Sequence, residues 1–137
     1  MFCVAYRSTL DSGVGEAEVQ SIASLAAQKN AEVGVTGLWL LSGHQNLSAI
    51  EGAPREVRHL IETIWDDPRH GAFKLLSVGA IPYARFDWPF RLIRAQSLEE
   101  EPALREHPGI NWLCGFSGGV DAFFGTRQAR SATGSNH

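Results

Sequence analysis

The first part of the chain changes from a strand-like to a helix-like pattern of apolar positions. Residues 2–6 (FCVAY) are apolar and β-prone, and the turn-forming residues among 7–15 predict a loop after this strand. Residues 16–30 carry apolar side chains at the i, i+3, i+4 and i+7 spacing of one helix face: Val19, Ile22, Ala23 and Ala26. We therefore predict a strand over 2–6 and an amphipathic helix over 16–30 that ends at Asn30.

The middle of the chain has the pattern of a hairpin followed by a second helix. Residues 33–42 (VGVTGLWLLS) are nearly all apolar or small, which favours a buried strand. Gly43-His44 makes a tight reversal, and residues 46–51 form the second strand of the hairpin. Pro54 suits the first turn of a helix, whose apolar stripe extends over 57–65 and which ends at Asp67-Pro68. Residues 73–81 and 90–93 are the last two predicted strands.

The predicted order of elements is therefore β-α-β-β-α-β-β, an α+β class. Right-handed crossovers place both helices on the same face of a mixed five-stranded sheet, in the ferredoxin-like arrangement with one added strand. Two helices over one sheet leave a slot between them that a flat ligand can enter. We assign residues 1–95 to this domain.

The C-terminal part has a weaker pattern. We expect residues 96–126 to form an extension that packs on the open face of the sheet or against a second subunit. Its closely spaced apolar side chains are Trp112, Leu113, Phe116, Phe123 and Phe124. Residues 127–137 are polar and small, which predicts a disordered tail.

Composition and charge exclude several classes of protein. The 137 residues are 44% hydrophobic, enough for one core without a metal or disulfide. Twelve basic residues against 15 acidic ones give a net charge of -3, which provides no basic field for nucleic acid or an anionic membrane. Residues 1–7 lack the basic start and long apolar run typical of a signal peptide, and no apolar run in the sequence is long enough to cross a membrane. We expect a soluble, cytoplasmic protein.

Each candidate catalytic or metal-binding motif in the sequence lacks a part that its chemistry requires. Residues 115–119 (GFSGG) match the pattern around a hydrolase nucleophile, but the few residues after them (120–137) cannot build the required sheet. Gly13-Val14-Gly15 lacks both the third glycine of a dinucleotide loop and a Walker lysine. The five histidines and two cysteines have no metal-ligand spacing. We therefore predict neither an enzyme nor a metal site.

A more specific constellation lies around the two predicted helices. Ile22, Ala26, Lys29 and Asn30 share one face of the first helix. Tyr6 ends the first strand, and Arg69-His70 follow the second helix. Taken singly, each has a structural interpretation: a core aromatic for Tyr6, a helix cap for Asn30 and a solvated turn residue for Arg69.

Taken in order, these residues resemble the BLUF family, the blue-light sensors that use flavin. The resemblance covers residues 3–93. It is carried by VAYRS (4–8), KN (29–30), VTGLWLL (35–41), IEG (50–52), the helix over 54–65, DDPRH (66–70) and FDW (86–88). The family's fold agrees with the order of elements predicted above.

The resemblance implies a flavin cofactor, FAD with FMN as the alternative, bound between the two helices. Ile22 and Ala26 then line the ring, and Asn30 and Lys29 meet its polar pyrimidine edge. Arg69 reaches the same edge, with His70 near it. Tyr6 is the light-driven electron donor, and Trp88 is the aromatic residue whose position in or out of the pocket follows signalling.

The sequence departs from the family pattern at three positions. Ser48 stands where the family has the glutamine that rearranges between tyrosine and flavin, and Gln45, three positions away, points to the opposite face of the strand. Phe90 replaces a methionine, and Lys29 replaces a histidine or asparagine. We therefore expect a flavin-binding sensory domain whose photocycle is altered or absent. Its output passes to a separate effector or through homo-oligomerisation. The alternative is a protein-interaction module of the same fold that no longer binds flavin.

Overall fold

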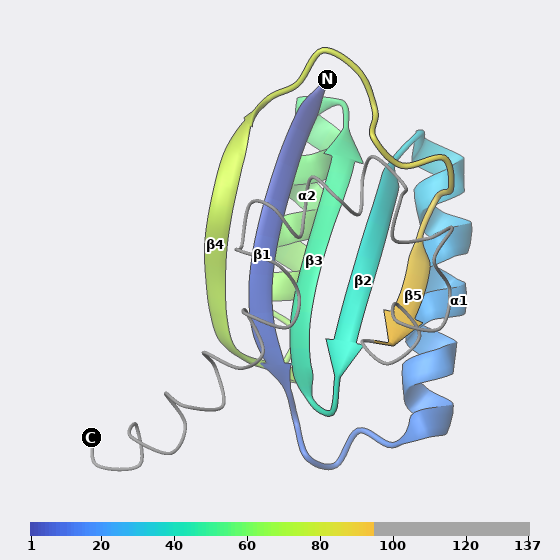
Figure 1. The fold of residues 1–137 in the computed structure, drawn as a ribbon, viewed down its shortest axis with the longest axis vertical. Helices are drawn as coiled ribbons and strands as arrows, with labels where there is room; N and C mark the ends of the chain where they lie inside the picture. The colour runs from blue at the N-terminus through green and yellow to red at the C-terminus, as the bar shows by residue number, and fades with distance from the viewer. Residues whose placement is uncertain (95–137) are drawn as a thin grey trace.

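The computed structural model describes residues 1–94, which form one sheet and two helices (Figure 1). The elements follow the predicted β-α-β-β-α-β-β order. They are β1 (Phe2–Leu10), α1 (Glu16–Val33), β2 (Thr36–Ser42), β3 (Gln45–Gly52), α2 (Pro54–Trp65), β4 (His70–Ala80) and β5 (Arg91–Arg94). The predicted extension (96–126) and tail (127–137) lie outside the described residues.

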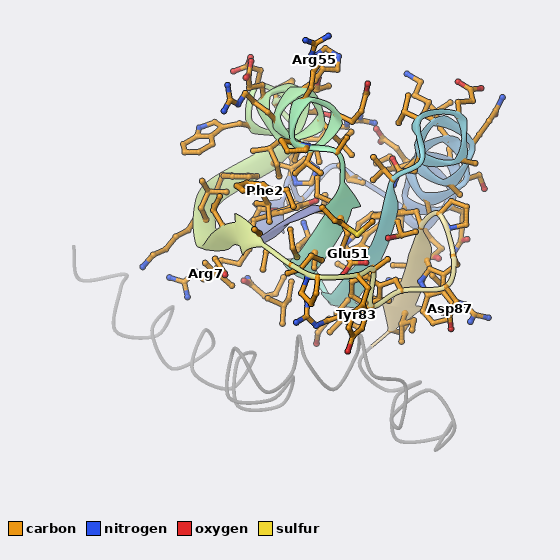
Figure 2. All side chains as sticks on the ribbon, turned by 90° about the horizontal axis from the view of Figure 1, so that it is seen from above. Phe2, Arg7, Glu51, Arg55, Tyr83 and Asp87 are labelled. Atoms are coloured by element: carbon orange, nitrogen blue, oxygen red, sulfur yellow. The ribbon has the colours of Figure 1, made fainter. Side chains whose placement is uncertain are left out.

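The sheet is mixed, as predicted, with the strand order β4-β1-β3-β2-β5. β1 pairs antiparallel with β3 and β4, β2 pairs antiparallel with β3, and β5 lies parallel to β2. Each helix therefore connects two parallel strands with a third strand between them, the split βαβ unit of the ferredoxin-like fold. Both helices cover the same face (Figure 2).

Several boundaries differ from the predicted ones. β1 continues to Leu10, because residues 7–10 of this central strand pair with a neighbour on both sides. The prediction that the first helix ends at Asn30 was wrong: α1 continues to Val33, and Gly34 ends it in the left-handed conformation (φ 71°) that glycine adopts without strain. β4 begins at His70, three residues before the predicted start, so His70 belongs to the sheet.

The core has two layers, one on each face of the sheet. The face opposite α1 and α2 carries a cluster of Cys3, Ala5, Leu38, Leu40, Leu47, Ala49, Phe86 and Ile93. The helix face is divided in two. Val57 and Ile61 of α2 pack on Val4, Tyr6, Val35 and Ile50. Val19 of α1 packs on Leu10, Val14, Trp39 and Leu41.

The segment between β4 and β5 is fastened to the sheet by a buried carboxylate. Glu51 on β3 is 0% exposed, and its carboxylate accepts hydrogen bonds from the backbone N–H groups of Arg85 (2.9 Å) and Phe86 (3.2 Å). It also accepts one from the Thr36 hydroxyl at 2.8 Å. These bonds satisfy a charge that would be costly to bury alone, and they fix the path of residues 81–90.

Within residues 1–94, neither helix is long and apolar enough to span a bilayer.

Candidate functional site: a cleft between the two helices

A cleft opens between α1 and α2, above the two separated parts of the core. Its cavity volume is about 240 Å³, slightly below the range of about 300–1,000 Å³ typical of small-molecule sites. One wall is α1, the other is α2, and strands β1, β2 and β3 form the floor. The lining residues are Tyr6, Glu18, Ser21, Ile22, Leu25, Ala26, Lys29, Asn30, Trp39, Ser48, Ile50, Leu60, Thr63, Ile64, Asp67, Arg69, His70 and Phe90.

The walls of the cleft are apolar and incompletely packed. Leu25 of α1 faces the cleft and is 51% exposed, and Ile22 and Ala26 beside it are only half-buried. Of the whole helix, only Val19 and Asn30 are buried. α1 therefore presents a partly exposed apolar stripe to the cleft, although Ile22 also packs against the core under α1. This arrangement favours a flat apolar ligand.

Tyr6 and Ser48 lie on the floor as direct partners in the β1–β3 register. Burial raises the pKa of the Tyr6 phenol to about 12, partly opposed by a hydrogen bond with the Ser48 hydroxyl. Phe73 stacks on the tyrosine ring, with centroids 5.0 Å apart and planes 17° apart. The phenol is thus held in one orientation and carries its proton at neutral pH.

Trp39 is a floor residue that the sequence prediction missed. It pairs with Ser48 in the β2–β3 register, and its indole N–H donates to Asn46 Oδ1 at 2.6 Å. The indole therefore extends from the position opposite Ser48 toward a residue two places along β3. Phe90 packs at its edge, with ring centroids 6.3 Å apart. The alternation along β2 was the available signal, since it places Trp39 and Leu41 on the helix face.

Asn30 lies at one end of the cleft and is nearly inaccessible, 2% exposed. Its Nδ2 donates to the Pro89 carbonyl oxygen at 3.0 Å, which joins α1 to the segment before β5. This leaves Oδ1 and the second N–H of the amide for a ligand. Lys29 is exposed at the rim beside it.

Arg69 closes the other end of the cleft as part of a charged cluster. Its guanidinium bonds Asp67 through Nη2 at 2.6 Å and reaches Glu18 on α1 at 3.4 Å. The same guanidinium holds the pKa of Asp67 below its usual value. Glu18 precedes Asn30 by more than three helical turns, a separation of about 18 Å along the helix axis. Arg69 and Asn30 thus lie toward opposite ends of the cleft, and the expectation that both meet one edge of the ligand stays a prediction.

His70 lies beside Arg69 and also faces the cleft. Its Nδ1 is 2.9 Å from the Ser8 hydroxyl oxygen on β1. Burial lowers the pKa of the imidazole, and Arg69 lowers it further, while Asp67 acts in the opposite direction. The ring is therefore a neutral polar group at the edge of the floor.

Comparison with known proteins identifies this architecture. A family model described as sensors of blue-light using FAD matches residues 1–90. The chain belongs to the BLUF family. The BLUF protein BlrB in its dark state has a TM-score of 0.69 and 28% identity, over 75% of this chain and 80% of BlrB. Klebsiella pneumoniae BlrP1 with FMN and cyclic diGMP has a TM-score of 0.69 and 26% identity, over 80% of this chain but only 31% of BlrP1.

BlsA in its photo-activated state has a TM-score of 0.67 at 21% identity, over 79% of each chain, which shows the shared fold. A search of curated proteins gave no match.

The BLUF fold brings nine of the ten predicted site residues to the cleft. They are Tyr6, Ile22, Ala26, Lys29, Asn30, Ser48, Arg69, His70 and Phe90. Trp88 is the exception, because it packs against the core cluster on the face opposite α1 and α2, with the Arg91 guanidinium 4.8 Å from its ring centroid. Gln45 shares the strand face of Leu47 and Ala49, opposite to Ser48, as alternation predicts.

The cleft fits the flat ring system of a flavin. Apolar walls from two helices match the ring faces, and the Asn30 amide offers both a donor and an acceptor, which suits an edge of carbonyl and N–H groups. The Arg69 guanidinium already bonds two carboxylates. These contacts use Nε and one N–H on each of Nη1 and Nη2, so two of its five N–H donors remain for a ligand edge.

Proposed function

We propose that this chain is a flavin-binding sensory module that holds FAD between α1 and α2. The apolar cleft that ends at the buried Asn30 amide is the observation that supports this proposal. Ile22, Leu25 and Ala26 contact one face of the ring, Leu60 and Ile64 contact the other, and Asn30 bonds the polar edge. FMN, which has the same ring, is the alternative cofactor.

A bound flavin absorbs blue light and can then accept an electron. Tyr6 is the proposed donor, because it lies on the floor of the cleft. Its high pKa keeps the proton on the phenol oxygen in the dark. Phe73 and Ser48 hold the phenol in one position, so little rearrangement precedes electron transfer.

We further propose that the light response differs from that of BLUF proteins with a glutamine at this position. A glutamine amide has a donor and an acceptor that can exchange places, which gives two stable hydrogen-bond patterns. Ser48 has one short hydroxyl, already bonded to Tyr6, and Trp39 occupies the neighbouring position. The expected behaviour is flavin binding without a long-lived red-shifted state.

The proposal includes a partner that receives the signal, either a second copy of this chain or a separate effector protein.

The deciding experiment is the visible absorption spectrum of the purified protein, before and after incubation with FAD and removal of the excess. A flavin band near stoichiometric occupancy supports the sensor. Protein that stays colourless after incubation with FAD or with FMN and removal of the excess supports the interaction module instead. Calorimetric titration with each flavin then decides which cofactor binds more tightly.

A further inference from the structure

Three buried polar side chains and the partly buried His70 form a continuous chain of hydrogen bonds across the floor of the cleft. Trp39 Nε1 is 2.6 Å from Asn46 Oδ1, Asn46 Nδ2 is 2.9 Å from Ser8 Oγ, and Ser8 Oγ is 2.9 Å from His70 Nδ1. The four residues come from β2, β3, β1 and β4, four consecutive strands of the sheet. Both end residues, Trp39 and His70, line the cleft.

The direction of every hydrogen bond in this chain follows from its tryptophan end. An indole N–H can only donate, so Asn46 must turn its oxygen toward Trp39 and its NH₂ toward Ser8. An amide turned the other way would place two donors against each other. The Ser8 oxygen is therefore an acceptor for Asn46.

The same logic continues from Ser8 to the histidine. Ser8 is 2% exposed, so its hydroxyl hydrogen needs a protein acceptor. Of its two hydrogen-bond partners among residues 1–94, Asn46 Nδ2 only donates, which leaves His70 Nδ1 as the acceptor. A ring nitrogen that accepts carries no proton. In a neutral imidazole the proton then resides on Nε2.

We propose that Trp39, Asn46 and Ser8 are positioning residues that hold His70 as its neutral Nε2–H tautomer, so that this end of the cleft presents a hydrogen-bond donor to an acceptor oxygen of the ligand. The low pKa that burial gives His70 agrees with a neutral ring. The ligand part of this inference rests on the proposed flavin function. The tautomer part concerns the free protein and does not.

The arrangement has a consequence for ligand choice. Arg69, the neighbouring cation, is engaged by Asp67 and Glu18. His70 is thus a neutral donor beside a charge that is already compensated. It selects for an oxygen acceptor, such as a ring carbonyl or a phosphate, and against a donor at the same place.

The test uses one isosteric substitution, Asn46→Asp, which reverses the direction of the hydrogen bonds that connect residue 46, Ser8 and His70. A carboxylate accepts from Trp39 and also from the Ser8 hydroxyl, so the Ser8 oxygen becomes the acceptor for His70 and Nδ1 must carry a proton. Long-range ¹H–¹⁵N correlation spectra of the histidine rings distinguish the two states, and His70→Gln identifies the His70 signals. The expected result is protonated Nε2 and bare Nδ1 in the wild type, and protonated Nδ1 in Asn46→Asp.

Two further variants keep the test decisive. Gln45→Glu makes the same chemical change on the other face of β3 and leaves the His70 signals as in the wild type. Trp39→Phe removes the donor that orients the Asn46 amide, so both His70 tautomers should appear in this variant. It therefore provides the test if Asn46→Asp fails to fold. Protonated Nδ1 in the wild type, or His70 signals unchanged in both Asn46→Asp and Trp39→Phe, would overturn the inference.

Titration with FAD and with riboflavin tests the ligand part. Asn46→Asp weakens FAD binding about tenfold, the loss expected for one hydrogen bond. Equal weakening with riboflavin assigns the acceptor to the ring, and weakening with FAD alone assigns it to a phosphate. Unchanged affinity for both overturns the ligand part. Failure of the wild type to bind any flavin overturns the proposed function, while the tautomer result stands on its own spectra.

Discussion

Residue 48 and residue 39 share one space on the floor of the cleft, so a change at one should depend on the other. Ser48 is 1% exposed and pairs with Trp39 in the β2–β3 register. The Trp39 indole extends from this position toward Asn46, to which its N–H donates a hydrogen bond. Ser48→Gln restores the amide on which the BLUF photocycle depends, but the longer side chain meets the indole. Trp39→Leu removes that obstacle. We therefore predict that the two substitutions are coupled.

The sizes of the effects follow from this geometry. Ser48→Gln alone overpacks a buried site and costs about 1–3 kcal/mol of unfolding free energy. Trp39→Leu alone costs about 2–4 kcal/mol, because it leaves a cavity and deprives the buried Asn46 oxygen of its donor. In the double variant the glutamine occupies the vacated space, so its destabilisation falls about 1–2 kcal/mol short of the sum of the two single effects.

Urea denaturation of the wild type, the two single variants and the double variant measures this coupling and needs no illumination. Ser24→Gln, on the exposed surface of α1, is the matched control and should show no coupling with Trp39→Leu. Light-minus-dark spectra of the same proteins with FAD then test function, and we expect the red-shifted state in the double variant only. Additive unfolding energies, together with a normal red shift in the unmodified protein, would refute the argument.

Three further predictions concern separate features. Asn30→Ala should weaken FAD binding by about 1–3 kcal/mol, ten- to a hundredfold in the dissociation constant; an unchanged constant in calorimetric titration would contradict the assigned role. Glu51→Gln should lower the unfolding free energy by about 1–3 kcal/mol in urea denaturation, since it places an NH₂ group against the Arg85 N–H, whereas the exposed control Glu62→Gln should stay within about 0.5 kcal/mol of wild type. The pKa of His70 in the folded protein lies below its unfolded value, and Asp67 and Arg69 are its charged neighbours. The unfolded chain therefore binds more protons than the folded one as the pH falls below about 6.5, and the unfolding free energy declines. His70→Gln should flatten this decline between about pH 7 and pH 5.

The order of elements was predictable because the patterns that encode it are local. The change of period at residue 16, the Gly43-His44 reversal and Pro54 mark transitions that tertiary contacts do not override. Element ends were less certain. Residues 7–10 resemble a loop by composition, and only pairing with strands on both sides makes them part of β1. Asn30 has the residue type of a helix end, but Gly34, four residues later, is the stronger end signal because it adopts the left-handed conformation.

Most of the residues that line the site were predictable from the sequence, but the hydrogen bonds that connect them were not. Helix periodicity and the family resemblance locate Ile22, Ala26 and Asn30 on one face. Neither reveals that Asn30 bonds the Pro89 carbonyl, because that contact joins residues far apart in the chain. The same applies to Trp39 and Asn46, whose roles depend on strand register. The partners of charged side chains are hardest to predict, because the sequence pattern does not indicate that the Arg69 guanidinium bonds both Asp67 and Glu18.

The two anchors on the segment before β5 also determine how this part of the sheet comes apart. Among the described residues β5 pairs with β2 over Arg91–Arg94, and its approach is held by Glu51 on one side and by Asn30 on the other. We expect residues 81–94 to open as one cooperative unit before global unfolding, because side chains from other elements hold the segment that leads to β5. Amide exchange in this unit should therefore depend on Glu51 and Asn30, together with the burial of Ile93 and the Arg94–Glu16 ion pair. Because one of them lines the cleft, a ligand that immobilises Asn30 lowers the opening frequency of a strand it does not touch.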